Sequence, residues 1–202
     1  MTYDLLIGDR SYSSWSLRGW LLFAKFNVDT VVHETRLSTP QFRKSLEKFS
    51  PARTVPALRL PEGGVVMDSL GIAETLAERH PEKGYWPEDA NARALARGMV
   101  AEMHSGYSAL RTACPMNLRQ SFVEFPVSDD VAAEVSRIEH LWSLARKHAS
   151  KGPWLFGDYS TADAFFAPVA ARMASYGLSN NEQSKQYVAE TISDPVFCGA
   201  TT

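Results

Sequence analysis

Residues 54–69 read Thr-Val-Pro-Ala-Leu-Arg-Leu-Pro-Glu-Gly-Gly-Val-Val-Met-Asp-Ser, and this stretch decides the fold. Two short apolar runs, 56–60 and 65–67, flank the segment 61–64, where one proline and two glycines favour a reversal of the chain. The closing Asp-Ser pair then opens a segment over 69–79 whose apolar residues follow helical spacing. The stretch therefore predicts a β-hairpin that leads directly into a helix.

The sequence before this hairpin predicts two strands and two helices in alternation. Residues 3–8 are a short apolar run ended by glycine, and residues 30–34 are rich in β-branched side chains. Residues 14–26 have helical spacing after a group of serines, and the segment 39–48 opens with Thr-Pro, a favourable helix start. Two strands joined through a helix form a parallel pair, whereas the hairpin adds an antiparallel pair.

The second half of the chain has a different pattern. A stretch with proline and glycine, 82–88, predicts a linker, so we expect one domain over 1–81 and a second over 90–202. Strand signals almost disappear after the linker, which predicts an all-helical second domain. The expected helices cover 91–113, 128–149, 160–175 and 181–192.

Composition and charge exclude several classes of function. The 202 residues contain 45% hydrophobic and 22% charged residues, as is usual for globular proteins. The net charge of −2 and the lack of a long apolar run predict no nucleic-acid partner and no membrane association. Cys114 and Cys198 form no CxxC pair, and the five histidines show no metal-type spacing. With no signal-peptide pattern at the start, we expect a cytoplasmic protein with reduced thiols and no metal.

Three short polar segments stand where a strand meets a helix or an irregular stretch of backbone. They are Ser-Tyr-Ser-Ser-Trp at 11–15, Thr-Val-Pro at 54–56 and Met-Asp-Ser at 67–69. Polar side chains and backbone N–H groups at such junctions bind small charged ligands. In this order, the segments predict a site that holds a small, charged, peptide-like thiol beside a hydroxyl group.

The element order and these segments together resemble the glutathione S-transferase superfamily over nearly the whole chain. The serine-rich segment, with Trp15 and Arg18 behind it, is most similar to the zeta class, related to maleylacetoacetate isomerases, and to bacterial serine-type transferases. The resemblance implies a thioredoxin-like α/β domain of order βαβ–ββα, followed by an all-α helical bundle. It also implies a homodimer that uses glutathione as co-substrate to detoxify small electrophiles.

The same resemblance implies that a serine hydroxyl stabilises the glutathione thiolate. Counting back from Arg18, the zeta pattern Ser-Ser-Cys-x-Trp-Arg places this serine at Ser11, but Ser13 replaces the cysteine and is a second catalytic candidate. Lowering a thiol pKa from ~8.5 by about two units requires ~2.7 kcal/mol. One charged hydrogen bond supplies ~1.5–3 kcal/mol and a helix N-terminus ~0.3–1 kcal/mol, so no general base is needed. The alternative for Ser13 or Ser14 is a plain N-cap.

The glutathione site implied by the resemblance draws on all three segments. Val55 would pair with the cysteinyl backbone of glutathione, after a cis bond to Pro56 that turns its N–H and C=O outward. Asp68 would pair with the ammonium group, while Ser69 and nearby N–H groups would bind the γ-glutamyl carboxylate. The alternatives are an ordinary loop proline and a plain Asp N-cap. The expected glutathione-binding residues are Ser14, Trp15, Arg53, Val55, Pro56, Asp68 and Ser69.

The second substrate is less well defined by the sequence. One stripe of the expected helix 91–113 carries His104, Tyr107 and Arg111, which are candidates for the electrophile pocket, with Arg111 binding an anionic substrate. The alternative is a dimer or solvent face. Maleylacetoacetate isomerases carry an arginine after the capping box, where this chain has Ser175 and the nearest arginine is Arg172.

Three functions remain open at this point. The favoured one is a transferase that conjugates glutathione to small electrophiles. The second is a zeta-like isomerase, in which the thiolate adds to a cis double bond, allows rotation and leaves unchanged. The third is a non-catalytic binding protein of the same fold. Ser160 and Asp163 resemble the family's structural capping box, and Phe49 is a candidate for an aromatic side chain inserted into a dimer partner.

Overall fold

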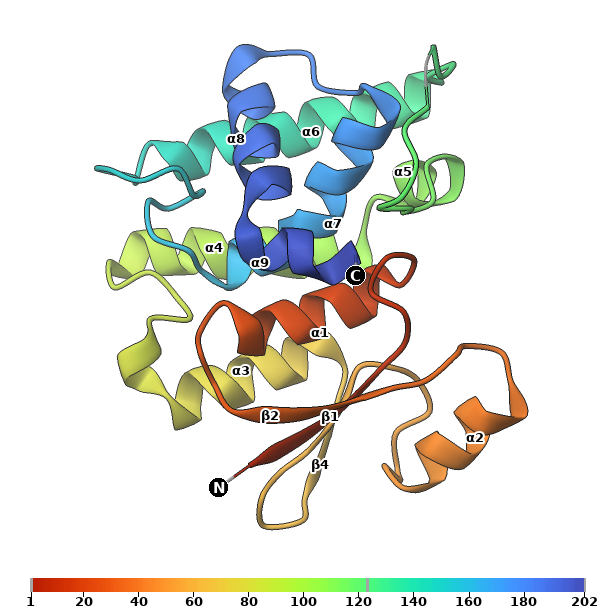
Figure 1. Cartoon of the computed structure of the whole chain (residues 1–202). Helices are drawn as coiled ribbons and strands as arrows, with labels where there is room; N and C mark the ends of the chain where they lie inside the picture. The colour runs from red at the N-terminus through yellow and green to blue at the C-terminus, as the bar shows by residue number, and fades with distance from the viewer. Residues whose placement is uncertain (1, 123, 202) are drawn as a thin grey trace. The chain divides into compact units, whose positions relative to one another are not determined.

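The computed structural model describes residues 2–122 and 124–201. The chain divides into two compact units, and the division falls between Tyr85 and Trp86, inside the segment interpreted as a linker. Figure 1 shows a mixed α/β unit formed by the first part of the chain and a helical unit formed by the rest.

The first unit has the βαβ–ββα order that the sequence predicts. Its sheet has the strand order β2-β1-β3-β4, in which β1 pairs in parallel with β2 and antiparallel with β3. The hairpin strands β3 and β4 are antiparallel, so both predicted kinds of pairing are confirmed. The elements are β1 (Tyr3–Ile7), α1 (Ser14–Ala24), β2 (Thr30–Glu34), α2 (Pro40–Glu47), β3 (Ala57–Arg59), β4 (Val65–Met67), α3 (Ser69–Arg79) and the 3₁₀ turn η1 (Pro81–Lys83).

The core of this unit lies around the central strand β1. Its residues Leu5, Leu6 and Ile7 are all fully buried, which is expected for a strand covered on both faces. Helices α1 and α3 contact each other and bury their own apolar stripes. Near the end of the unit, the Tyr85 hydroxyl donates a 2.7 Å hydrogen bond to the Leu22 carbonyl, which fastens the last residues to α1.

The second unit is built from helices around the buried helix α7. The elements are α4 (Ala90–Ser105), α5 (Ser108–Ala113), α6 (Asp129–Arg146), α7 (Thr161–Tyr176), α8 (Glu182–Ser193), α9 (Pro195–Cys198) and the 3₁₀ turn η2 (Gly199–Thr201). The single helix predicted over 91–113 is wrong, because α4 ends at Ser105 and α5 begins at Ser108. Tyr107 takes a left-handed conformation, with φ of 60°, and this breaks the helix.

The capping box predicted at the start of α7 is present. Asp163 is fully buried, and its carboxylate accepts hydrogen bonds from the backbone N–H groups of Leu155 and Ser160, each at 2.9 Å. The hydroxyls of Ser160 and Tyr187 also donate to it, at 3.1 and 3.2 Å. Burial nevertheless raises the pKa of Asp163 to about 6.

Three further properties limit the chemistry of the chain. Cys114 and Cys198 are both present as thiols; Cys114 is buried, which raises its pKa, and Cys198 is exposed. None of the helices in the described part of the chain has both the length and the apolar character needed to span a bilayer. Residues 2–122 and 124–201 also contain no group of three or more His, Cys, Asp or Glu side chains suited to a metal ion.

Candidate functional site

The serine-rich segment forms a tight turn that leads into α1. The carbonyl of Asp9 accepts the Ser13 N–H at 2.8 Å, and the Asp9 carboxylate accepts the Ser11 N–H, also at 2.8 Å. Ser13 is the N-cap of α1, because its hydroxyl oxygen accepts the Ser16 N–H at 3.3 Å. Asp9 was not predicted from the sequence, although an aspartate that accepts the N–H of the residue two positions later is a known turn signal.

The serines differ in their access to a ligand. Ser11 is fully buried and Ser14 nearly so, whereas Ser13 is only partly buried. A hydroxyl can accept one hydrogen bond and donate another, so the cap formed by Ser13 leaves its proton available. Within the described residues the Ser13 hydroxyl has no partner other than Ser16. Ser13 therefore has the geometry of a donor to a ligand at the N-terminus of α1.

Arg18 and Trp15 support the wall behind this turn. The Arg18 side chain is fully buried, and its guanidinium carbon lies 4.6 Å from the centre of the Trp15 ring, within cation–π range. Trp15 itself is partly buried and faces a cavity. The two residues that define the sequence motif behind the serines thus form one stacked pair.

The Val55–Pro56 peptide bond is cis, as expected from the resemblance. Pro56 packs directly on α1 at Gly19, where a Cβ atom would lie 2.6 Å from the Pro56 Cβ and 2.8 Å from its Cγ. Only glycine permits this approach, since real Cβ contacts are never so short. Arg53 is exposed and is not among the residues that line the adjacent cavity.

Asp68 and Ser69 form the junction between β4 and α3. Asp68 has a φ of 71°, and its carboxylate caps α3 by accepting the Leu70 N–H at 2.8 Å, while its side chain stays exposed. Ser69 is fully buried, and its hydroxyl has no hydrogen-bond partner in residues 2–122 and 124–201. A buried hydroxyl without a partner costs about 1–3 kcal/mol. A ligand would relieve this cost only if the junction opens to admit it, because Ser69 is fully buried.

A cavity of about 220 Å³ joins residues from all three polar segments of the sequence. It is lined by Trp15, Thr54, Val55, Pro56 and Asp68. Segments far apart in the sequence, from Trp15 to Asp68, therefore meet at one surface of the first unit. Ser11, Ser13, Ser14, Arg53 and Ser69 do not line this cavity.

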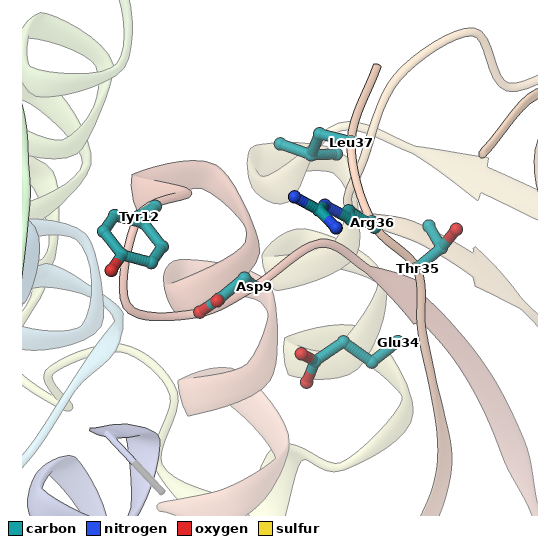
Figure 2. Close-up of a pocket in the computed structure, with 6 residues that line it drawn as sticks. All are labelled: Asp9, Tyr12, Glu34, Thr35, Arg36 and Leu37. Atoms are coloured by element: carbon teal, nitrogen blue, oxygen red, sulfur yellow. The ribbon is translucent and has the colours of Figure 1, made fainter. Parts of the chain in front are cut away.

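A larger cavity of about 570 Å³ was missed by the sequence analysis. Figure 2 shows its six lining residues, which come from the turn before α1, from the last residue of β2 and from the segment that follows β2. No motif signals this cavity, because its residues are ordinary polar and apolar side chains of two connecting segments and of the end of β2. They are Asp9, Tyr12, Glu34, Thr35, Arg36 and Leu37.

The residues proposed for the electrophile pocket gather instead around the break between α4 and α5. Arg111 donates hydrogen bonds to the carbonyls of Gly106, at 2.9 Å, and Met103, at 2.6 Å. These two carbonyls lie at the C-terminal end of α4. The Tyr107 hydroxyl donates to Glu102 at 2.7 Å, and burial raises the Tyr107 pKa. Arg111 and Tyr107 thus both stabilise the helix break, and their role in an electrophile pocket stays a prediction.

His104 and Arg172 are engaged in the helical unit as well. The His104 ring lies 6.3 Å from the ring of Phe165. Arg172 donates to the carbonyls of Cys114, at 2.9 Å, and Pro168, at 3.1 Å. Burial lowers the pKa of Arg172 to about 10. Neither side chain lines the two cavities described above.

Comparison with known proteins places these features in a family context. Residues 12–79 match the family described as glutathione S-transferase, N-terminal domain. The chain is 34% identical over 203 residues to a probable maleylacetoacetate isomerase of Caenorhabditis elegans, covering 95% of this chain and 89% of that protein. It is 27% identical over 149 residues to the maleylacetoacetate isomerase of Dictyostelium discoideum, covering 70% of this chain and 66% of that protein.

Solved structures show the same fold at lower sequence identity. A Burkholderia glutathione transferase homolog with bound glutathione has a TM-score of 0.70 and 22% identity, covering 100% of this chain and 96% of that chain. Ure2p in complex with S-hexylglutathione has a TM-score of 0.72 and 16% identity, with 99% and 98% covered. The predicted fold, a thioredoxin-like unit followed by a helical unit, is confirmed.

Proposed function

Because the chain belongs to the glutathione S-transferase superfamily and is zeta-like, we propose that it activates the glutathione thiol with a serine hydroxyl and transfers the thiolate to small electrophiles. The observation that carries this proposal is the cavity in which Trp15, Val55 and Asp68 meet, one residue from each polar segment. Family membership makes the chain a glutathione-dependent enzyme rather than a non-catalytic binding protein.

Glutathione would lie across the residues of this cavity. The Val55 backbone would pair with its cysteinyl unit, and the exposed Asp68 carboxylate would attract its ammonium group. The first N–H groups of α3 would receive the γ-glutamyl carboxylate. The unpartnered Ser69 hydroxyl is fully buried, so it would reach this carboxylate only if the junction opens. Ser14 and Arg53 were expected as further contacts. Ser14 is buried at the start of α1 and Arg53 is exposed outside the cavity, so we do not place either in direct contact with glutathione.

Ser13 is the better candidate for thiolate activation, and Ser11 is the alternative. Ser13 combines partial exposure, an available proton and a position at the start of α1, where the helix dipole also favours negative charge. The thiol proton passes to solvent, the Ser13 hydroxyl donates to the thiolate, and the sulfur then attacks the electrophilic carbon. Ser11 is fully buried, so a ligand sulfur reaches it only if the turn rearranges.

Isomerisation is a second candidate function. It is favoured by the C. elegans relative, which is named as a probable maleylacetoacetate isomerase and is 34% identical. In that reaction the thiolate adds to the double bond and leaves after rotation, so the same glutathione site serves both chemistries. Arg172 is already engaged by two carbonyls, however, so substrate binding by an arginine of α7 lacks support.

We also propose that the protein is cytoplasmic and forms a homodimer, with no metal cofactor. The location follows from the two thiols and the ordinary globular composition. Phe49, considered as an aromatic for a partner subunit, is buried in its own unit with Leu6, Ala52 and Ala57. The Arg59 guanidinium also covers its ring at 4.6 Å. The dimer is therefore proposed without an inserted Phe49.

The first test is calorimetric titration of glutathione into the wild type and Asp68→Asn. Asparagine keeps the cap on Leu70 and tolerates a positive φ, so this change removes the charge while sparing the fold. Loss of an exposed ion pair should weaken binding by about 1 kcal/mol, a factor of about five.

Asp89→Asn is the matched control for this titration. Asp89 is an exposed N-cap of α4 that accepts the Ala92 N–H at 2.8 Å, so the same change there should leave the affinity for glutathione unaltered. Equal affinities for all three proteins would reject the placement of glutathione. A wild type that neither binds glutathione nor conjugates it to an electrophile would reject the function.

A further inference from the structure

The larger cavity of the first unit adjoins the turn that carries the proposed thiolate donor. Asp9 and Tyr12 line it on one side, and Trp15 lines the smaller, glutathione-binding cavity. Ser13 lies between Tyr12 and Trp15 in the chain and is tied to Asp9 by its own N–H. A thiolate bound at Ser13 would therefore lie on the same turn whose Asp9 and Tyr12 side chains line the larger cavity. At about 570 Å³, this space is in the range of small-molecule pockets.

The walls of this cavity combine apolar and charged groups. Figure 2 shows Glu34 at the end of β2, and Arg36 and Leu37 just after it, extending toward Asp9 and Tyr12, whereas Thr35 points away from them. Tyr12 and Leu37 are large hydrophobic side chains with exposed fractions of 51% and 39%. Such side chains offer a planar or apolar ligand a surface on which to pack.

Among the described residues that line the cavity, Arg36 is the one basic side chain. Its side chain is exposed, and its guanidinium makes no hydrogen bond or ion pair within residues 2–122 and 124–201. Arginine binds carboxylates through two parallel N–H groups, which makes an uncommitted guanidinium at a cavity wall a carboxylate receptor.

The two acidic residues of the cavity are already engaged. The Glu34 carboxylate lies 3.8 Å from the guanidinium of Arg10, and the Asp9 carboxylate accepts the Ser11 N–H at 2.8 Å. Their negative charges make the part of the cavity near Asp9 and Glu34 unfavourable for another carboxylate. A ligand with one carboxylate would therefore point that group toward Arg36.

Two other arginines considered for substrate binding are committed to the protein. Arg111 and Arg172 donate to backbone carbonyls of the helical unit. Arg36 has no such partners among the described residues, and it is therefore the better candidate of the three for binding a substrate carboxylate.

We propose that the cavity lined by Tyr12, Arg36 and Leu37 is the electrophile pocket, and that Arg36 makes it selective for planar electrophiles that carry one carboxylate. This inference rests on the proposed glutathione chemistry. In the conjugation of an aryl chloride, the thiolate sulfur forms a bond to the ring carbon and chloride leaves with the electrons of the C–Cl bond. Arg36 holds the carboxylate and takes no part in bond making.

The test compares 4-chloro-3,5-dinitrobenzoate with its methyl ester, at saturating glutathione. Each kcat/KM is divided by the uncatalysed rate with glutathione, which removes the intrinsic difference in reactivity. The wild type should favour the acid. Arg36→Gln should lower kcat/KM for the acid by roughly five- to tenfold, the range from an exposed ion pair to a bidentate one, and leave the ester unchanged. Arg36→Lys should restore part of the preference for the acid, because lysine returns the positive charge but not the two parallel N–H donors of the guanidinium.

The matched control is Arg43→Gln, at an exposed arginine on α2 that lines neither cavity. It should leave both rates unchanged. Equal effects of Arg36→Gln on the acid and the ester, or no effect on either, would overturn the inference. A loss confined to glutathione affinity in calorimetry would also overturn it, because Arg36 would then bind a carboxylate of glutathione.

The outcomes also separate this inference from the proposed function. Conjugation of the ester without any preference for the acid rejects the electrophile assignment alone. If the wild type conjugates neither compound, the proposed function fails and the inference fails with it.

Discussion

Ser13 performs two tasks with one hydroxyl group. Its oxygen caps α1 by accepting the Ser16 N–H, and its proton remains available for a thiolate. A substitution of Ser13 would therefore change both the stability of the fold and the proposed chemistry. Any measurement on Ser13 has to separate the two.

We expect Ser13→Ala to raise the apparent pKa of bound glutathione thiol by about one to two units, the equivalent of a lost charged hydrogen bond. The ultraviolet absorbance of the thiolate, followed against pH, measures this directly. Loss of the cap should also lower the free energy of unfolding by about 1 kcal/mol.

Ser128→Ala is the control for the cap, because the Ser128 hydroxyl accepts the Val131 N–H at the start of α6. It should cost similar stability and leave the thiol titration unaltered. A shift seen with Ser11→Ala and absent from Ser13→Ala would transfer the role to Ser11. No shift in either variant or in the double variant would refute activation by a hydroxyl.

At the level of elements, Gly19 sets how closely α1 approaches the loop that carries Val55 and Pro56. A Cβ at this position would overlap the Pro56 ring. We expect Gly19→Ala to destabilise the fold by about 1–3 kcal/mol, as overpacking does, and to weaken glutathione binding by displacing Pro56.

Gly98→Ala is the matched substitution in another helix, and we expect it to raise the stability instead of lowering it. Gly98 lies in the exposed interior of α4 with open space around it, so alanine should stabilise the helix by about 0.5–1 kcal/mol. Urea unfolding of both variants measures the two effects. Equal changes in the two variants would show that packing on Pro56 is unimportant.

The buried Asp163 at the start of α7 predicts a pH dependence of stability. Its pKa is about 6 in the fold and about 3.9 when unfolded, so the folded state binds the extra proton between these values. Stability from this group therefore falls as pH rises from about 4 to 6, by on the order of 3 kcal/mol, and is constant above that.

Asp163→Asn removes the titrating group. Subtracting its unfolding free energy from that of the wild type, between pH 4 and 7, should give a difference that falls with pH. A difference that rises with pH would mean that the four hydrogen bonds to the carboxylate outweigh the effect of burial.

The elements of the first unit were largely predictable, because strong local signals coincide with their ends. Thr39-Pro40 and Asp68-Ser69 act as helix starts both in the sequence and in the structure. The break between α4 and α5 was not predictable, because Tyr107 continues the helical spacing and is not a residue that favours positive φ. The role of Arg111 depends on that break, so it could not be inferred from the stripe on which the residue lies.

The part of the candidate site that is formed by sequence motifs was predictable, and the part formed by the loop after β2 was not. Trp15, Val55, Pro56 and Asp68 each stand at the end of an element, and the sheet brings those ends together. Arg36 follows a strand with no special turn chemistry, and whether its guanidinium is engaged depends on neighbours distant in the chain. The sequence around Arg36 does not indicate which residues those neighbours are.

For the whole molecule, the remaining expectation is a two-fold homodimer. Closed two-fold pairs are the commonest oligomers, and light scattering at micromolar concentration should report about twice the 22.4 kDa of one chain. Because Phe49 is buried in its own unit, Phe49→Ala should destabilise that unit rather than merely separate the subunits. A stable particle of one chain that still binds glutathione would exclude the dimer.

The contrast between the two cysteines makes the chain convenient for single-site labelling. A maleimide fluorophore reacts with exposed thiols, so in the native protein it would attach at Cys198 and spare the buried Cys114. Homogeneous conjugates are then available without removing any native cysteine. The fluorescence of a dye at Cys198 would then report changes around α9, the helix that ends at this residue, during turnover.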